Sequence, residues 1–477
     1  MEDMEQDGFI IVPRNGEESS SIQSTTHQDV KLPEYLSDID NFIESVAESL
    51  WPLNSFIHEN PELAFQEHKA HKALTDFMRA QEGWQVTPSA YGMETAWVAV
   101  YDSGRPGPAV SFNVEMGMSF SPHTIICTAI TNNPPPPPDA LPNLGHACGH
   151  NLIATASLAA ALATASLIRH HNLPGKVFLF GTPGEETYRG GKIRLLEHHA
   201  YAPVDISLIS HPGITHNNPL VRTTAFARVE AAFHGRAAHA AKEPWRGINA
   251  LDALVVAYAA VAALRQQTMP GDVIGFAITD GGGEAANVIH DYAACACVLR
   301  ARSAARLEVL MEKVSGCLRA GGEATGARVE VKVTQGYKDH VPNRVLAGVY
   351  RRYWNALGEV PGPAVPPEEC GEAGVAHVMS STDQGDVSYV VPSVNASFAI
   401  PPGPLGGQPH SPDFERASGT RAAFERALRV GKALAGVAVE VLAREGLLDE
   451  VKRGWKRDME GAKNPERLVS GISRDTL

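Results

Sequence analysis

The sequence lacks the features of a secreted, membrane-embedded or nucleic-acid-binding protein. Its six cysteines have no framework spacing, which fits a reducing compartment. No stretch resembles a secretory signal or a membrane-spanning run of about 20 apolar residues. Its 41 Lys and Arg are outnumbered by 54 Asp and Glu, for a net charge of −13, which argues against nucleic acid or an anionic membrane as the main partner. We therefore expect a cytoplasmic enzyme.

Two domains are expected in a chain of 477 residues, of which 44% are apolar, because a single hydrophobic core seldom grows to that size. Residues 1–33 are acidic and serine-rich, which predicts a disordered tail. Residues 34–220 and 337–477 alternate between apolar strands and amphipathic helices, a pattern typical of an α/β sheet with parallel strands. An alanine-rich stretch at 154–168 predicts a buried helix. The charged residues after Lys452 are expected to add little.

Residues 221–336 differ in the order of their elements. Alternation of apolar and polar residues predicts four strands, and helical periodicity predicts two helices. In chain order we expect strand 224–233, helix 248–265, strands 273–279 and 294–300, helix 304–320 and strand 328–334. This β-α-β-β-α-β order is that of a ferredoxin-like domain. The small domain is therefore expected to be an insertion into a larger, discontinuous one.

Cys148 and His150 lie two residues apart directly before the predicted buried helix, with His146 just upstream. A thiolate and an imidazole at this spacing can turn toward one cation. They suit zinc or its borderline-soft neighbours rather than calcium or magnesium. Taken alone, the segment fits equally well a structural cysteine beside a helix-capping histidine.

Further candidate ligands follow the next two apolar strands. Glu185 and Glu186 end one strand and His211 ends the next, and open α/β sheets bind ligands at the C-terminal ends of their strands. One glutamate could bind a metal while its neighbour takes a proton from the attacking water. Alone, such a pair is more often a solvated turn, and a loop histidine such as His410 is more often a surface residue. Together the candidates form a strong set of five metal ligands: Cys148, His150, Glu186, His211 and His410.

Several short motifs occur in unbroken order between residues 35 and 445. Three surround the candidate ligands: His146-Ala147-Cys148-Gly149-His150, Gly181-Thr182-Pro183-Gly184-Glu185-Glu186 and Ile209-Ser210-His211-Pro212. The others are residues 58–63, 235–241, 281–283, 287–289 and 381–388. In these motifs the chain resembles the zinc metallopeptidase family twenty of aminoacylases, carboxypeptidases and amidohydrolases. Within that family it resembles the branch of auxin-conjugate amidohydrolases and β-alanyl-lysine-type dipeptidases.

The resemblance implies an α/β zinc-peptidase catalytic domain with an inserted ferredoxin-like lid, which also joins two subunits into a homodimer. It implies hydrolysis of the amide bond of a dipeptide or an N-acyl amino acid. The five ligands would hold two divalent ions, zinc or else manganese or cobalt. Glu185 would be the general base, and His239 of the lid would reach the scissile carbonyl of a substrate held by the other subunit. Asn287 and Arg300 become candidates for holding the substrate's carboxylate or carbonyl.

Two features depart from the family pattern. Gly184 stands where the family usually has alanine, a change expected to be tolerated. Residues 117–138, which include five consecutive prolines, separate Met116 from Asp139-Ala140-Leu141-Pro142, although the family reads Glu-Met-Asp-Ala-Leu-Pro without a break. We predict that this segment is a retained intron, which would leave the 477-residue form weakly active or inactive. The alternative is a genuine surface loop, since long loops cost little free energy.

Two other functions are compatible with the same residues. The chain could be a catalytically impaired family member, disrupted by the 117–138 segment, that serves as a binding or scaffold protein. It could also be a metallohydrolase that acts on a carbamoyl or ester bond. The complete set of ligands and a base argues against the first of these.

Overall fold

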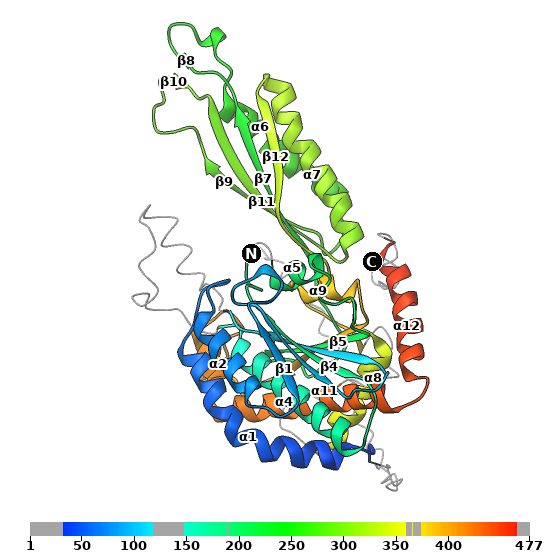
Figure 1. Cartoon of the computed structure of the whole chain (residues 1–477). Coiled ribbons are helices and arrows are strands. Elements are labelled where there is room, and N and C mark those ends of the chain that lie inside the picture. The colour runs from blue at the N-terminus through cyan, green and yellow to red at the C-terminus, as the bar shows by residue number, and fades with distance from the viewer. Residues whose placement is uncertain (1–31, 118–146, 188–189, 359–364, 366–373, 465–477) are drawn as a thin grey trace, which may run out of the picture. The chain divides into compact units, whose positions relative to one another are not determined.

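The computed structural model describes residues 32–117, 147–187, 190–358, 365 and 374–464. The expected tail 1–33 and the predicted intron 117–138 therefore lie outside the described residues, except for Leu32, Pro33 and Gly117. From Pro33 onward the described residues belong to one compact unit, whose helices and strands are drawn in Figure 1. It has two main hydrophobic cores.

The first core is built around a six-stranded sheet. Its strands are β1 (Trp84–Pro88), β2 (Trp97–Asp102), β3 (Ala109–Glu115), β4 (Lys176–Thr182), β5 (Ile206–Gly213) and β14 (Ser393–Ala399). They lie in the order β1-β2-β4-β3-β5-β14. The expected parallel pairing is confirmed for β4, β3, β5 and β14, whereas β1 and β2 form an antiparallel edge that the sequence pattern did not indicate.

Long helices complete this core: α1 (Leu36–Glu59), α4 (His150–His170), α8 (Arg344–Ala356) and α11 (Arg421–Ala443). The alanine-rich surface of α4 lets its neighbours approach closely. A Cβ at Gly431 of α11 would lie 3.0 Å from the Ala156 carbonyl oxygen. By length and composition α4 could cross a membrane, but 94% of its apolar window is buried inside the protein. The buried helix expected at 154–168 is thus confirmed as a core helix.

Two short helices, α5 (Gly191–Glu197) and α9 (Gln384–Ser388), pack on the other face of the sheet. Successive side chains of a strand point to opposite faces. In β4, accordingly, Leu179 joins the core of the long helices, while Phe180 packs with Leu195 of α5. Strand β4, which leads to Glu185 and Glu186, is therefore held between two packed layers.

The remaining helices of this part are α2 (His68–Arg79), α10 (Pro412–Ser418) and α12 (Leu447–Ala462). The expectation that residues after Lys452 add little is wrong. Helix α12 continues to Ala462, and Met459 and Ala462 pack on Val341 in a small core of their own. The charged residues on its outer side obscured this helical stripe in the sequence.

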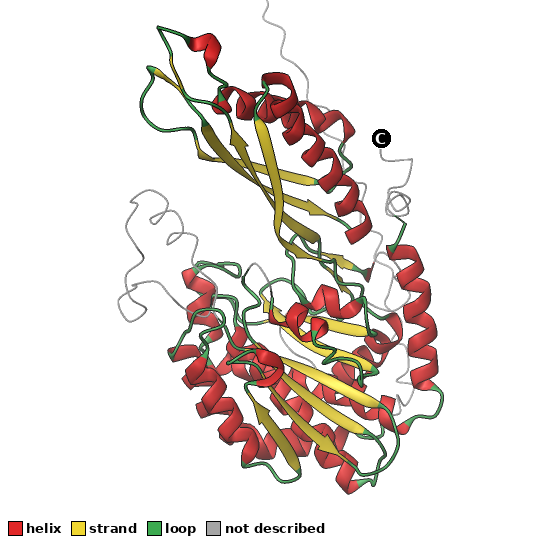
Figure 2. Cartoon of the chain, turned by 45° about the horizontal axis from the view of Figure 1, so that its top comes forward, coloured by secondary structure: helices red, strands yellow, loops and turns green. Residues whose placement is uncertain are grey.

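The second core belongs to the lid, whose elements are β7 (Ala225–His234), α6 (Ala250–Ala263), β9 (Val273–Asp280), β11 (Tyr292–Ala301), α7 (Ala304–Thr325) and β12 (Arg328–Tyr337). The four strands pair antiparallel in the order β12-β7-β11-β9. Both helices cover the same face of this sheet (Figure 2). The ferredoxin-like order expected from the sequence is confirmed.

Two short strand pairs complete the fold. Near the lid's base, β6 (Val221–Arg222) pairs parallel with β13 (Ala376–His377). Within the lid, β8 (Ala238–His239) pairs antiparallel with β10 (Val288–Ile289). We call the second pair the β8–β10 ribbon.

Candidate metal centre

The predicted ligands lie on loop ends that the backbone holds in unusual conformations. Gly149 precedes helix α4 with φ +75°, and a Cβ there would lie 2.7 Å from Pro212, the residue after His211. His410 also has a positive φ, +70°, a strained conformation for a non-glycine residue that clusters at functional sites. Its backbone N–H donates to the carbonyl of Ala147 at 2.7 Å. The loop before α4 therefore contacts the segments that carry both histidines.

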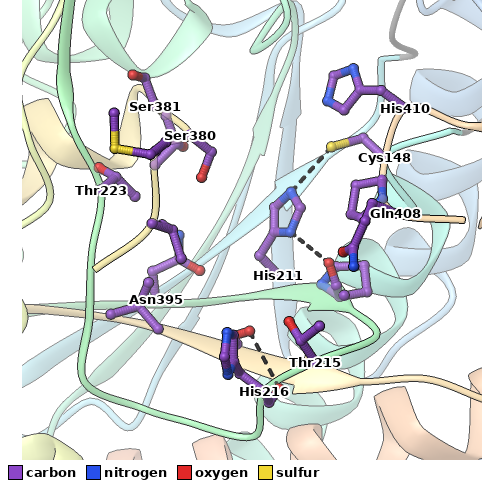
Figure 3. Close-up of a pocket in the computed structure, with 18 of the residues that line it drawn as sticks. Cys148, His211, Thr215, His216, Thr223, Ser380, Ser381, Asn395, Gln408 and His410 are labelled. Carbon is purple, nitrogen blue, oxygen red and sulfur yellow. Dashed lines mark hydrogen bonds between the residues drawn. The ribbon is translucent and has the colours of Figure 1, made fainter. Parts of the chain in front are cut away.

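The structure brings all five predicted ligands together, and Figure 3 shows three of them, Cys148, His211 and His410. Cys148 Sγ lies 3.2 Å from His211 Nε2. Glu186 Oε1 lies 3.6 Å from His410 Nε2 and 3.9 Å from His150 Nε2. In two groups, Cys148–His150–His211 and Cys148–Glu186–His410, all ligand atoms lie within 4.8 Å of one another. Cys148 belongs to both groups, so its sulfur lies where two ions could share it.

Unpaired polar atoms in this cluster fit a metal ion. His150 Nε2 and Glu186 Oε1 are buried without a hydrogen-bond partner among the described residues, which is unfavourable unless something else binds them. The Nδ1 atoms of His150 and His211 bond to the carbonyls of Gly117, at 2.5 Å, and Pro212, at 2.8 Å. Because carbonyls only accept, these Nδ1 atoms carry the protons and leave both Nε2 atoms as ligands. Thiolate, imidazole and carboxylate donors together are typical of zinc.

Negative charge accumulates around the cluster. Burial raises the pKa of the Cys148 thiol well above its usual range, and Glu186 and Glu185 add to this effect. Burial also raises the pKa of Glu185 well above its usual range, followed by the effect of the neighbouring carboxylates, Glu115 first. Divalent cations at this place would neutralise the excess of negative charge.

Sequence reasoning assigned no role in the site to three buried charged residues beside the ligands: Glu115, Lys192 and Asp383. Lys192 Nζ donates to Glu115 Oε1 at 2.7 Å and to Asp383 Oδ1 at 2.5 Å. Although burial acts to raise it, the Lys192 ammonium brings the pKa of Glu115 below its usual value. The signal for Glu115 was a carboxylate at the end of an otherwise uncharged, buried strand. No sequence signal marks Lys192, because a lysine in a short helix is usually exposed.

The turn that carries the two glutamates is held by a buried carboxylate, Glu67. Its Oε1 accepts from the Gly184 N–H at 2.8 Å, and its Oε2 accepts from Thr95 Oγ1 at 2.9 Å. Gly184 has φ +67°, and a Cβ there would lie 2.5 Å from the Phe65 ring. In this chain the residue before Glu185 therefore has to be small and has to adopt a left-handed backbone conformation.

A cavity of about 550 Å³ opens beside the ligands (Figure 3). Cys148, Glu185, Glu186, His211 and His410 line one part of its wall. Hydroxyl, amide and imidazole groups line another part: Thr215, His216, Thr223, Ser380, Ser381, Thr382, Asn395, Ser397 and Gln408. The cavity therefore offers hydrogen bonds to a polar substrate next to the candidate metal centre.

Comparison with known proteins decides the family. Residues 222–325 match the peptidase dimerisation domain. The chain is 35% identical over 421 residues to the Xaa-Arg dipeptidase of Mus musculus, covering 87% of this chain and 90% of that protein. It is 34% identical over 440 residues to the Xaa-Arg dipeptidase of Homo sapiens, covering 90% and 93%. The chain belongs to peptidase family M20.

The M20 fold is also shared with a solved structure, that of a dinuclear metal-binding M20 peptidase from Bacillus subtilis. The two match with a TM-score of 0.56 and 16% identity, over 84% of this chain and 99% of that one. The resemblance inferred from the motifs is confirmed, and this M20 peptidase is a hydrolase of peptide or amide bonds.

The three lid residues predicted to act on the substrate are not gathered at the cavity of this M20 peptidase as the ligands are. His239 and Asn287 are exposed on or beside the β8–β10 ribbon, and neither is among the described residues that line the cavity. Arg300 does reach the cavity wall, where it donates to the Met379 carbonyl at 3.0 Å and to Ser381 Oγ at 2.7 Å. Among the described contacts of the three predicted lid residues, Arg300 is the one that bonds to residues lining the cavity of its own chain.

Proposed function

We propose that this M20 peptidase hydrolyses the amide bond of dipeptides, and that dipeptides with a C-terminal arginine are its first candidate substrates. The observation that carries the proposal is the cluster of five ligand side chains beside a polar cavity. The substrate class rests on the 35% identity to a protein named Xaa-Arg dipeptidase.

In this proposal the metal ligands are Cys148, His150, Glu186, His211 and His410. They would hold two divalent ions, zinc by the softness of the thiolate, with manganese or cobalt able to use the same donors. When bound, such ions lower the pKa of a coordinated water and polarise the scissile carbonyl. The Nδ1 hydrogen bonds of His150 and His211 would keep their rings oriented toward the ions.

Glu185 would take the proton of the attacking water and later deliver it to the leaving amine. Its carboxylate lines the cavity, and its ligand atom lies within 4.8 Å of those of Glu115 and His150. This position beside the ligand cluster is the one that a general base for a metal-bound water needs. The Gly184 N–H bond to Glu67 would hold the turn in place. General acid–base help of this kind is typically worth about 10²- to 10⁴-fold in rate.

His239 would act on the substrate of the partner subunit, donating to the oxyanion that forms at the scissile carbonyl. Its exposure on the β8–β10 ribbon, away from its own cavity, supports action in trans. Asn287, whose carbonyl accepts from the Ala240 N–H, would lie beside it. Arg300 would act on the substrate through Ser381, whose hydroxyl it binds in the cavity wall. The match of the lid to a dimerisation domain supports a homodimer.

The test is turnover of a substrate panel by protein stripped with a chelator and then supplied with zinc, manganese or cobalt. The panel contains Xaa-Arg dipeptides, β-alanyl dipeptides, N-acyl amino acids, a carbamoyl amino acid and an ester. We expect metal-dependent hydrolysis of the Xaa-Arg dipeptides above the other classes. The 477-residue chain and a form without residues 117–138 are assayed side by side. The proposal is wrong if neither form, with metal bound, cleaves any dipeptide.

A further inference from the structure

Glu115 is the last residue of β3, a strand in which every residue is buried, and it is itself 2% exposed. Its two carboxylate oxygens have different surroundings. Oε1 accepts from Lys192 Nζ at 2.7 Å. Oε2 has no hydrogen-bond partner among the described residues and lies 3.4 Å from His150 Nε2. One oxygen is therefore fixed by a lysine, and the other faces a predicted ligand.

We propose that Glu115 Oε2 is a sixth metal ligand, bound to the same ion as His150 Nε2. The inference rests on the metal centre of the proposed function and gives a metal-binding role to a residue that the resemblance left without one. His150 Nε2 is available as a ligand because its Nδ1 donates to the Gly117 carbonyl. Glu115, His150 and Glu185 form a third group whose ligand atoms all lie within 4.8 Å of one another.

The separation of the two atoms fits ligands of one ion. Nitrogen and oxygen ligands lie about 2.0–2.1 Å from a tetrahedral zinc, which puts two of them about 3.4 Å apart. Glu115 Oε2 and His150 Nε2 lie 3.4 Å apart. Neither atom has a hydrogen-bond partner among the described residues. A cation between them would satisfy both.

The competing explanation is that Glu115 only balances the charge of buried Lys192. Asp383 shows what such a counter-ion looks like, since both its oxygens bind Lys192. Oδ1 accepts from Nζ at 2.5 Å and Oδ2 from the backbone N–H at 3.0 Å. A counter-ion does not need a buried oxygen left unpaired and facing a histidine, because such an oxygen loses its hydration without compensation. Asp383 thus accounts for the lysine, and Oε2 of Glu115 remains to be explained.

Lys192 would then orient the ligand rather than bind the metal. Carboxylates that bind metals are generally held by a hydrogen bond on their other side. With Oε1 fixed by Lys192 Nζ, Glu115 can turn only Oε2 toward the cluster. The lysine is fully buried, so this bond is shielded from solvent.

Glu115→Gln tests the inference, with Asp383→Asn as its matched control. Both substitutions keep the shape of the side chain and remove one negative charge from the partners of Lys192, but only Glu115 has an oxygen facing His150. Bound metal is measured by mass spectrometry after dialysis against buffered zinc, and coordination is followed in the visible spectrum of the cobalt-substituted protein. We expect Glu115→Gln to bind one of two ions at least about 10-fold more weakly, as other losses at metal sites do, and to change the cobalt spectrum. Asp383→Asn should keep two ions and the parental spectrum.

Three results separate the possible failures. If Glu115→Gln retains both ions with parental affinity and spectrum, the inference is wrong. Equal weakening in both variants would also overturn it, because charge alone would then explain the effect. A parent protein that binds no metal would instead contradict the proposed function itself.

A second variant covers the case in which Glu115→Gln fails to fold. Glu115→Asp keeps the charge and the pairing with Lys192 but shortens the reach by one methylene. It should weaken the same ion and alter the cobalt spectrum, while thermal unfolding in the presence of a chelator stays near the parental midpoint. A parental spectrum and affinity in this variant would count against the ligand role.

Discussion

The metal centre and the β8–β10 ribbon both carry residues expected to act in catalysis, but only the metal centre is assembled within one chain. Its predicted ligands are mostly buried and face one another. His150 and His211 are oriented by the hydrogen bonds that they donate to backbone carbonyls. His239 and Asn287 on the ribbon are exposed and lie outside their own cavity. A single chain therefore brings the predicted ligands together, whereas two of its three predicted lid residues lie away from its own cavity.

The surface of the lid also indicates that a partner is missing from the single chain. Most of the large hydrophobic side chains that are exposed in the described residues belong to the lid. They include Tyr258 on α6 and Ile278 on β9, each about half exposed. Exposed apolar groups gathered on one domain mark an interaction surface, and a homodimer would cover it with the same surface of a second copy. Substitutions in the metal centre and in the β8–β10 ribbon should therefore have different effects on metal content and activity.

The largest effect is expected from Cys148→Ala, because this sulfur belongs to both ligand groups. Metal content should fall to a small fraction of the parental value and hydrolysis should be abolished, while the circular dichroism spectrum stays unchanged. Cys297→Ala is the matched control, since Cys297 is an equally buried thiol in the core of the lid. Full metal occupancy in Cys148→Ala would show that the ligand assignment is wrong.

Glu185→Gln separates the two adjacent glutamates. Glutamine keeps the shape but cannot accept a proton, so kcat should fall by at least about 10²-fold while both ions remain bound. Glu186→Gln should instead lower the metal content, because Glu186 belongs to a ligand group with Cys148 and His410. Steady-state kinetics and metal analysis on the two variants distinguish the roles. Near-normal kcat in Glu185→Gln would move the base to another residue.

His239→Ala tests the β8–β10 ribbon. Loss of one oxyanion donor costs on the order of 10²- to 10³-fold in kcat, and metal content should not change. His234→Ala, a lid histidine at the end of β7, is the control and should stay near parental activity. Mixing the His239→Ala chain with the Glu185→Gln chain should restore activity, because one cavity of the mixed dimer then has both groups intact. Mixtures that stay inactive after verified subunit exchange would place the histidine in cis.

The fold could be predicted from the sequence where the spacing of apolar residues marks a helix or strand, and where candidate ligands follow the end of a strand. The lid order and the buried helix α4 follow from such patterns, and the five ligands lie at strand or helix boundaries. The antiparallel edge β1–β2 could not be predicted, because pairing direction leaves little trace in a single short strand. The pairing of Lys192 with Asp383 was not predicted for a related reason. They are 191 positions apart in the chain, and only the packing of α5 beside α9 brings them together.

Deleting residues 117–138 is expected to raise the activity of the 477-residue chain by about 10²-fold, the size of effect that a misplacement of about 1 Å near reacting groups can have. In the shortened chain Asp139 follows Met116 directly, and its carbonyl would replace that of Gly117, which accepts from His150 Nδ1. A deletion of 118–138 is the control, because it keeps Gly117 and shifts Asp139 by one position. The intron hypothesis fails if mature transcripts carry the whole segment and the long protein hydrolyses as fast as the deletion variant.

The smallest effect is expected from Gly184→Ala, which installs the residue that the family usually has beside the general base. Gly184 has φ +67°, and the new Cβ would lie 2.5 Å from the Phe65 ring. The Arg194 guanidinium lies over the same ring, 4.0 Å from its centroid. Overpacking of this kind typically costs about 1–3 kcal/mol. We expect a lower midpoint of thermal unfolding and a loss in kcat of about 10-fold, with both ions retained, because the turn that positions Glu185 has to move.

Two variants decide whether the Phe65 ring is the cause. Adding Phe65→Ala to Gly184→Ala removes the overlap and should restore part of kcat, leaving only the strain of a non-glycine residue at positive φ. Gly316→Ala, in helix α7 of the lid, adds a Cβ that meets no atom within 4 Å and should leave kcat unchanged while slightly raising stability. If Gly184→Ala alone keeps parental kcat and stability, the turn tolerates alanine after all. The glycine would then be neutral here, and the rigid placement of the base would have to come from the Glu67 hydrogen bond instead.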